Sequence, residues 1–218
     1  MLDKWLNKLE RRFGRYAISN LMLYVTLTMG MILLFDLFVS YNPNRSLSLI
    51  PFLTFDRDMI LQGQVWRIIT FLVIPHTGWL LLAFIELYFF WLIGTGVERQ
   101  WGAFRFNIYF FAGAIGCIIA GFITGYATNT YHYLSILLAF AILYPDYEIL
   151  LFFIIPVKIK WIALAEGILL AIAFFYGSWT ERLFLVLSLI NLVVFFGRTL
   201  WDKVFYTCRR YYYKWFKK

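Results

Sequence analysis

The chain has 218 residues and a formal net charge of +8; 62% of its residues are apolar and only 15% are charged. A soluble domain of this length has a far more charged surface, so the composition argues against a soluble enzyme and favours a polytopic membrane protein. Because a transmembrane helix takes about 20 apolar residues, the chain has room for about five or six of them and for no second folded domain.

Positive charge is concentrated at both ends of the chain. Basic residues flanking apolar runs predict that both termini lie in the cytoplasm, and they are expected to attract anionic lipid headgroups. Nucleic acid is not an expected partner, since these residues flank membrane spans and form no separate folded platform. The two cysteines, Cys117 and Cys208, are too few for a metal site, and no other cofactor is expected.

Residues 1–16 predict an amphipathic segment ahead of a membrane domain over 17–199. Trp5, Leu6, Leu9 and Phe13 recur at helical spacing, with basic residues between them. Such a helix is expected to lie on the inner leaflet, and a solvated helical tail fits the pattern equally well. Residues 200–218 are expected to form a basic cytoplasmic tail.

The apolar runs of the membrane domain predict an all-α bundle of six spans. They cover about 17–40, 79–95, 104–125, 131–144, 161–176 and 182–197. The connection 41–65 is too long for a simple turn between neighbouring helices, so we expect it to lie half immersed in the outer interface. Segments 66–75 and 147–160 are apolar but too short to span, and the second is expected to lie on the surface or to re-enter the membrane.

Small residues recur every four positions in the third predicted span. Such spacing on one helical face lets another helix approach closely, and we interpret it as core packing. The residues are Gly113, Cys117, Gly121 and Gly125.

Four passages resemble, in their order and spacing, the rhomboid intramembrane serine proteases and their inactive relatives such as derlins. They are 63–70 (GQVWRIIT), 94–106, 143–146 (LYPD) and 149–161. The passage 94–106 matches the family pattern G-x-x-x-E-x-x-x-G-x-x-R-F. The passage 149–161 is similar to a passage common in bacterial members of the family. The resemblance implies a rhomboid-like six-helix bundle with a long interfacial first loop, in a bacterial cytoplasmic membrane. It also implies structural roles for Trp66, Arg67, Gly94, Glu98, Gly102 and Arg105.

The chemistry of that family requires residues that this chain lacks. Its members use a serine nucleophile in a G-x-S-x motif in the fourth span, a sixth-span histidine as base, and a second-span H-x-x-x-N for oxyanion donors. Here the serine position falls on Thr130, and the H-x-x-x-N positions fall on Leu82 and Glu86. The sixth span has no histidine, and Asn191 is its nearest polar substitute. The resemblance therefore implies the fold without the hydrolytic machinery.

Polar residues inside the predicted spans are the candidate site. A carboxylate such as Glu86 at a helix centre costs ~2.5–3.5 kcal/mol on insertion scales, so it should be paired or face a wet cavity. Arg67 is a candidate partner for it, and Glu98 is expected to pair with Arg105. The polar residues predict either a partner-binding cavity or a buried hydrogen-bonded network. They are Glu86, Thr130, His132, Ser135, Ser188 and Asn191.

Three functions remain open. The leading hypothesis is a pseudoprotease that binds transmembrane segments of other proteins, for quality control, trafficking or scaffolding. The second is a diverged active protease, in which His132 and Ser135, three residues apart on one helix, or Thr130 would supply the catalytic groups. The third is a channel or transporter subunit, which intramembrane polar residues permit but no inverted repeat supports.

Overall fold

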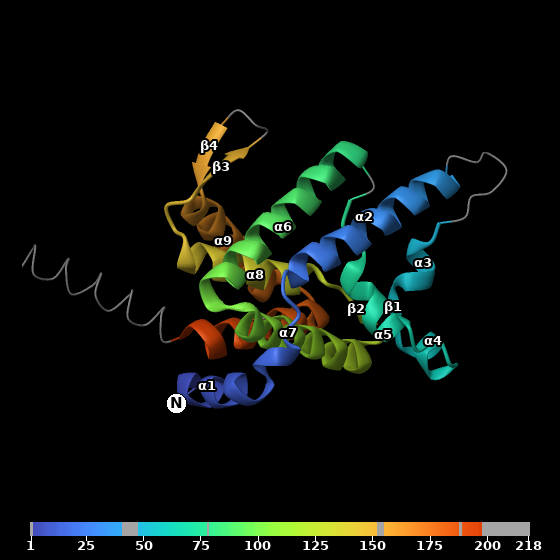
Figure 1. The fold of residues 1–218 in the computed structure, drawn as a ribbon. Coiled ribbons are helices and arrows are strands. Elements are labelled where there is room, and N and C mark those ends of the chain that lie inside the picture. The colour runs from blue at the N-terminus through green and yellow to red at the C-terminus, as the bar shows by residue number, and fades with distance from the viewer. Residues whose placement is uncertain (1, 41–47, 78, 152–154, 188, 198–218) are drawn as a thin grey trace, which may run out of the picture.

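Long helices make up most of the protein in a computed structural model that describes residues 2–40, 48–77, 79–151, 155–187 and 189–197 (Figure 1). Five helices are long and apolar enough to cross a membrane, and α8, with 14 residues, is apolar but shorter. The predicted all-α, multi-span class is confirmed, and each predicted span corresponds to one of these helices. They are α2 (Leu21–Ser40), α6 (Leu80–Trp101), α7 (Ala103–Thr124), α8 (Thr130–Leu143), α9 (Ile159–Tyr176) and the final helix Trp179–Gly197. The predicted tail 200–218 lies outside the described residues.

The helix α6 lies at the centre of the bundle and packs against α2 and α8. Its glycines permit these close approaches. A Cβ atom at Gly94 would overlap the side chain of Met22 on α2, and one at Gly96 would overlap the ring of Phe140 on α8. The predicted second span, 79–95, is therefore too short: α6 continues to Trp101, and these glycines are helix contacts.

The long connection between α2 and α6 is folded into short elements. They are α3 (Ile50–Leu53), β1 (Phe55–Asp56), α4 (Arg57–Leu61), α5 (Arg67–Thr70) and the 3-10 turn η2 (Phe71–Val73). Strand β1 pairs antiparallel with β2 (Tyr126–Ala127), which follows α7. The buried Arg67 guanidinium donates to the carbonyls of Pro51 and Thr54 at 2.7 and 2.8 Å, and Trp66 Nε1 donates to a third loop carbonyl. Trp66 and Arg67 thus hold the first loop together.

The apolar segment before α9 is a β-hairpin of β3 (Glu148–Leu151) and β4 (Ile155–Lys158). Glu148 pairs with Lys158 in its register, and Leu150 pairs with Pro156. Proline is tolerated here because a two-stranded ladder consists only of edge strands. The hairpin projects from the start of α9 (Figure 1), and the two short ladders leave the helical class unchanged.

The N-terminal helix α1 (Leu2–Phe13) lies beside the start of α7 (Figure 1). Leu6 is buried, and Arg105 on α7 contacts Glu10 at 3.2 Å and Asn7 at 2.5 Å. The expected Glu98–Arg105 pair is therefore wrong. Glu98 instead accepts from main-chain N–H groups at the start of α2, which have no partner within their own helix. α1 is followed by the short turn η1 (Gly14–Tyr16).

Candidate functional site

Glu86 lies in the first half of α6 and is paired with His76, which precedes that helix. Glu86 Oε1 accepts from the His76 main-chain N–H at 3.1 Å and lies 2.5 Å from His76 Nδ1. The suggested Arg67 partner is wrong, because the donors of Arg67 are engaged by oxygens of the first loop. The pairing with His76 offsets the cost of placing a carboxylate within an apolar span.

Aromatic rings surround the His76 imidazole. The rings of Phe90 on α6 and Tyr133 on α8 stack on each other with centroids 4.4 Å apart. Both meet the imidazole edge-on, at 5.8 and 5.9 Å. His76 is therefore wedged between α6 and α8, with 27% of its side chain exposed.

The segment leading to His76 is also tied to α8 by hydrogen bonds. The Tyr133 hydroxyl donates to the Leu72 carbonyl at 2.6 Å. Asn129 Nδ2 donates to the same carbonyl at 3.2 Å and to that of Ile74 at 2.9 Å. The role of the buried Asn129 was not predicted from the sequence. Its position directly before an apolar helix was the only sign of it there.

A groove opens beside Glu86, between α6, the β3–β4 hairpin and α9. Its volume is about 610 Å³, and apolar and aromatic side chains form almost all of its wall. Glu86 is the only charged side chain among the described residues that line it. Leu82, one turn earlier on α6, faces the same groove, as do Trp161 and Ile162 of α9. The groove therefore presents one carboxylate within an apolar surface at membrane depth.

The structure brings His132, Ser135 and Asn191 together in a second, buried cluster with Tyr109. The Tyr109 hydroxyl lies 2.9 Å from the Ser135 carbonyl and 3.1 Å from Ser135 Oγ. Asn191 Nδ2 donates to the Tyr109 carbonyl at 3.1 Å. A Cβ atom at Gly113 would overlap the His132 ring, so α7, α8 and the final helix meet closely here.

The hydroxyl and imidazole of this cluster are not joined. Ser135 Oγ donates to the main-chain carbonyl of His132 at 2.7 Å. Both ring nitrogens of His132 are buried and have no hydrogen-bond partner in the part of the chain that the structure describes. The imidazole is therefore not placed to take a proton from Ser135, as a serine nucleophile would require.

The remaining predicted residues lie elsewhere. The Thr130 hydroxyl, at the start of α8, is 2.8 Å from the hydroxyl of Thr128. Ser188 falls outside the described residues. Glu86 belongs to the groove, whereas His132, Ser135 and Asn191 form the interior cluster. The residues predicted to share one cavity or one hydrogen-bonded network therefore do not all lie together.

Comparison with known proteins finds a partial similarity to a rhomboid protease. No family model matches the chain. A stretch of 100 residues, 46% of the chain, is 32% identical to the rhomboid protease GluP of Bacillus subtilis. This stretch covers only 19% of the length of that protein. Together with the five apolar helices, the similarity supports a rhomboid-like relationship and an integral membrane protein.

Proposed function

We propose that this protein is a rhomboid-like pseudoprotease that binds transmembrane segments of other membrane proteins and does not cleave them. The groove between α6 and α9 is the observation that carries the proposal. Its apolar wall suits a lipid-embedded helix, and its one carboxylate suits a polar group on that helix. In this proposal the protein sits in a bacterial cytoplasmic membrane with both termini in the cytoplasm.

The contacts between Glu86 and His76 leave one carboxylate oxygen of Glu86 available to a bound segment. Glu86 Oε1 takes both contacts from His76, and Oε2 has no hydrogen bond within the described residues. A hydrogen-bond donor on a transmembrane segment, such as a serine, threonine or asparagine, would find few alternatives at this depth. We therefore expect preferred partners to be single-span proteins with a polar residue near the middle of the span.

Binding without hydrolysis is supported by the residues found where the rhomboid family has its catalytic residues. Leu82 cannot donate a hydrogen bond, and an ionised Glu86 would repel a developing oxyanion. The hydroxyls of Thr130 and Ser135 contact oxygen atoms within their own segment, and neither is bonded to an imidazole. These features favour a scaffold that binds a partner in the groove without cleaving it.

Cross-linking from the groove tests partner binding. A photoreactive p-benzoylphenylalanine at Leu82 should cross-link to single-span proteins in native membranes, because Leu82 lines the groove. The same probe at Leu81, which is 72% exposed but absent from the groove lining, is the matched control. Mass spectrometry of the adducts gives the readout. Equal cross-linking from both positions would contradict the proposal.

Glu86→Leu should abolish cross-linking from Leu82 while leaving the fold intact. Removing Glu86 alone leaves the His76 main-chain N–H and imidazole without their acceptor, but the His76 side chain is 27% exposed and can bind water instead, so the free energy of unfolding should fall by about 1–3 kcal/mol. Glu166→Leu, which removes a carboxylate from α9 outside the groove lining, should leave cross-linking unchanged. Loss of folding in Glu86→Leu, or unchanged cross-linking, would indicate a purely structural role for Glu86.

A diverged active serine protease is the second candidate, because the chain is similar to a protein named a rhomboid protease. Labelling of the purified protein with a fluorophosphonate probe separates the two functions. We expect no labelling that is sensitive to Ser135→Ala or Thr130→Ala, since neither hydroxyl is bonded to an imidazole. Labelling that either substitution removes would overturn the proposal and support hydrolysis.

A further inference from the structure

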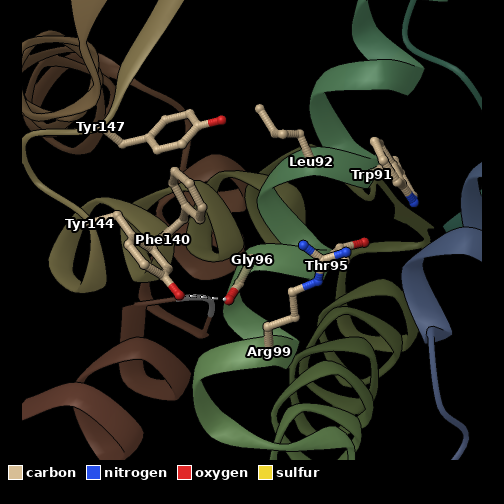
Figure 2. Close-up of a pocket in the computed structure, with 8 residues that line it drawn as sticks. All are labelled: Trp91, Leu92, Thr95, Gly96, Arg99, Phe140, Tyr144 and Tyr147. Atoms are coloured by element: carbon tan, nitrogen blue, oxygen red, sulfur yellow. Dashed lines mark hydrogen bonds between the residues drawn. The ribbon is translucent and has the colours of Figure 1, made fainter.

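A smaller pocket opens at the other end of α6, away from Glu86. Its volume is about 210 Å³, and it lies between the end of α6, the end of α8 and the loop that follows (Figure 2). Four aromatic side chains form its walls: Trp91, Phe140, Tyr144 and Tyr147. Arg99, in the last turn of α6, also lines it. Tryptophan and tyrosine are typical of the membrane–water interface, so the pocket is placed at headgroup depth.

Contacts within the protein hold the walls in place. The absence of a side chain at Gly96 lets the Phe140 ring lie directly against α6. The Tyr144 hydroxyl lies 3.5 Å from the Gly96 carbonyl (Figure 2). It also lies 3.2 Å from Gln100 Oε1, so these contacts join the end of α8 to α6. The pocket is therefore part of the packed bundle and does not depend on a ligand for its shape.

Arg99 differs from three other basic residues of the membrane domain in having no carboxylate partner among the described residues. Arg105, Lys158 and Lys160 each lie within ion-pair distance of a carboxylate. The exposed Arg99 has no such partner among the described residues. Figure 2 shows its side chain running back along α6, so that the guanidinium reaches the level of Thr95. A guanidinium is thus presented at the pocket without a neutralising anion.

Thr95 supplies a second polar group at the same place. It lies one turn before Arg99 on the same helix face and is only 7% exposed. Its Oγ1 atom is buried and has no hydrogen-bond partner in the described part of the chain. A threonine within a helix usually donates to a carbonyl of the preceding turn. Thr95 therefore keeps, in the wall of the pocket, a hydroxyl without a hydrogen-bond partner among the residues that the structure describes.

We propose that this pocket binds the phosphate group of an anionic phospholipid. A planar guanidinium matches the geometry of a phosphate and can bind two of its oxygens. The Thr95 hydroxyl would bind a third oxygen, and the aromatic walls and Leu92 would pack against the glycerol and the upper acyl chains. The positive charge of Arg99 disfavours lipids whose headgroup ends in an ammonium, so the lipid should carry net negative charge. A free phosphate ester shares this chemistry and is distinguished by the experiment.

Native mass spectrometry of the full chain in detergent tests this site. Short-chain phosphatidylglycerol should bind saturably and more tightly than short-chain phosphatidylcholine. Arg99→Gln should weaken phosphatidylglycerol binding by about tenfold to a hundredfold, the size expected for a charge-assisted hydrogen bond. Arg99→Lys should keep part of the affinity, because the charge remains and the fork geometry is lost. Thr95→Val, which keeps the shape, should cause a smaller loss.

Arg57→Gln is the matched control, because it removes the same charge from the first loop, where Arg57 contacts Asp58. It should leave phosphatidylglycerol binding unchanged. Equal weakening by Arg57→Gln and Arg99→Gln would overturn the site and show only general charge attraction. Displacement of the lipid by an equal concentration of inorganic phosphate would overturn the assignment to a lipid. Circular dichroism of each variant excludes misfolding as the cause of a loss.

Discussion

Replacing Glu98 with alanine should lower the free energy of unfolding by about 2–4 kcal/mol, because it leaves one buried and one partly buried main-chain N–H group without acceptors. Glu98 is 7% exposed, and its two carboxylate oxygens lie 2.5 Å from Asn20 N and 3.1 Å from Leu21 N. These groups begin α2, where the helix supplies no acceptor of its own and its dipole favours a negative charge. Unfolding in detergent, followed by circular dichroism, measures the loss.

Two substitutions control for this effect. Glu98→Gln keeps the shape and one acceptor oxygen, so it should cost less than the alanine variant. Glu10→Ala removes the more exposed ion pair with Arg105, and such pairs contribute about 0–1 kcal/mol. If Glu98→Ala and Glu10→Ala cost the same, then Glu98 does not hold the start of α2.

Helix boundaries were predictable where glycine ends a helix. The predicted spans 104–125 and 161–176 closely match Ala103–Thr124 and Ile159–Tyr176. Gly102 and Gly125 flank α7 with φ of 86° and 95°, a backbone region that favours glycine and stops a helix. Gly94 shows that a glycine in an apolar run does not always end a helix. In sequence it resembles the others, but it is a packing contact within α6, because Met22 from another helix occupies the space.

Polar residues within apolar runs were predictable as a class, but their partners were not. His132, Ser135 and Asn191 stood out because such residues are costly in a membrane. Tyr109, which joins Ser135 and Asn191, was missed because it is one of 15 tyrosines in an aromatic-rich chain.

The partners of the two acids on α6, Glu86 and Glu98, could be found only from the folded structure. Both proposed arginine partners, Arg67 for Glu86 and Arg105 for Glu98, were wrong. Glu86 binds a histidine that the turn at Pro75 brings back over α6, and Glu98 binds main-chain groups 78 residues away. Opposite charges in a sequence identify residues that could form an ion pair. The path of the chain determines which of them come into contact.

The second large effect is expected from Gly113→Ala on α7. A Cβ atom there would overlap the ring of His132 and lie 3.0 Å from Asn191 Nδ2. Both side chains are at least nine-tenths buried, so neither can move into open space. Overpacking of this kind costs about 1–3 kcal/mol. The free energy of unfolding in detergent should fall by that amount, although alanine is the better helix former.

Gly116→Ala, one turn further along α7, separates overpacking from a general effect of alanine. A Cβ at Gly116 would have its nearest neighbour, Leu187 Cβ, at 3.8 Å, an ordinary contact, so this variant should be neutral or slightly stabilising. A double-mutant cycle then tests the cause. In a His132→Ala background, Gly113→Ala should cost less than half as much, because the ring it overlaps is gone. An unchanged cost in that background would show that His132 does not set the distance between α7 and α8.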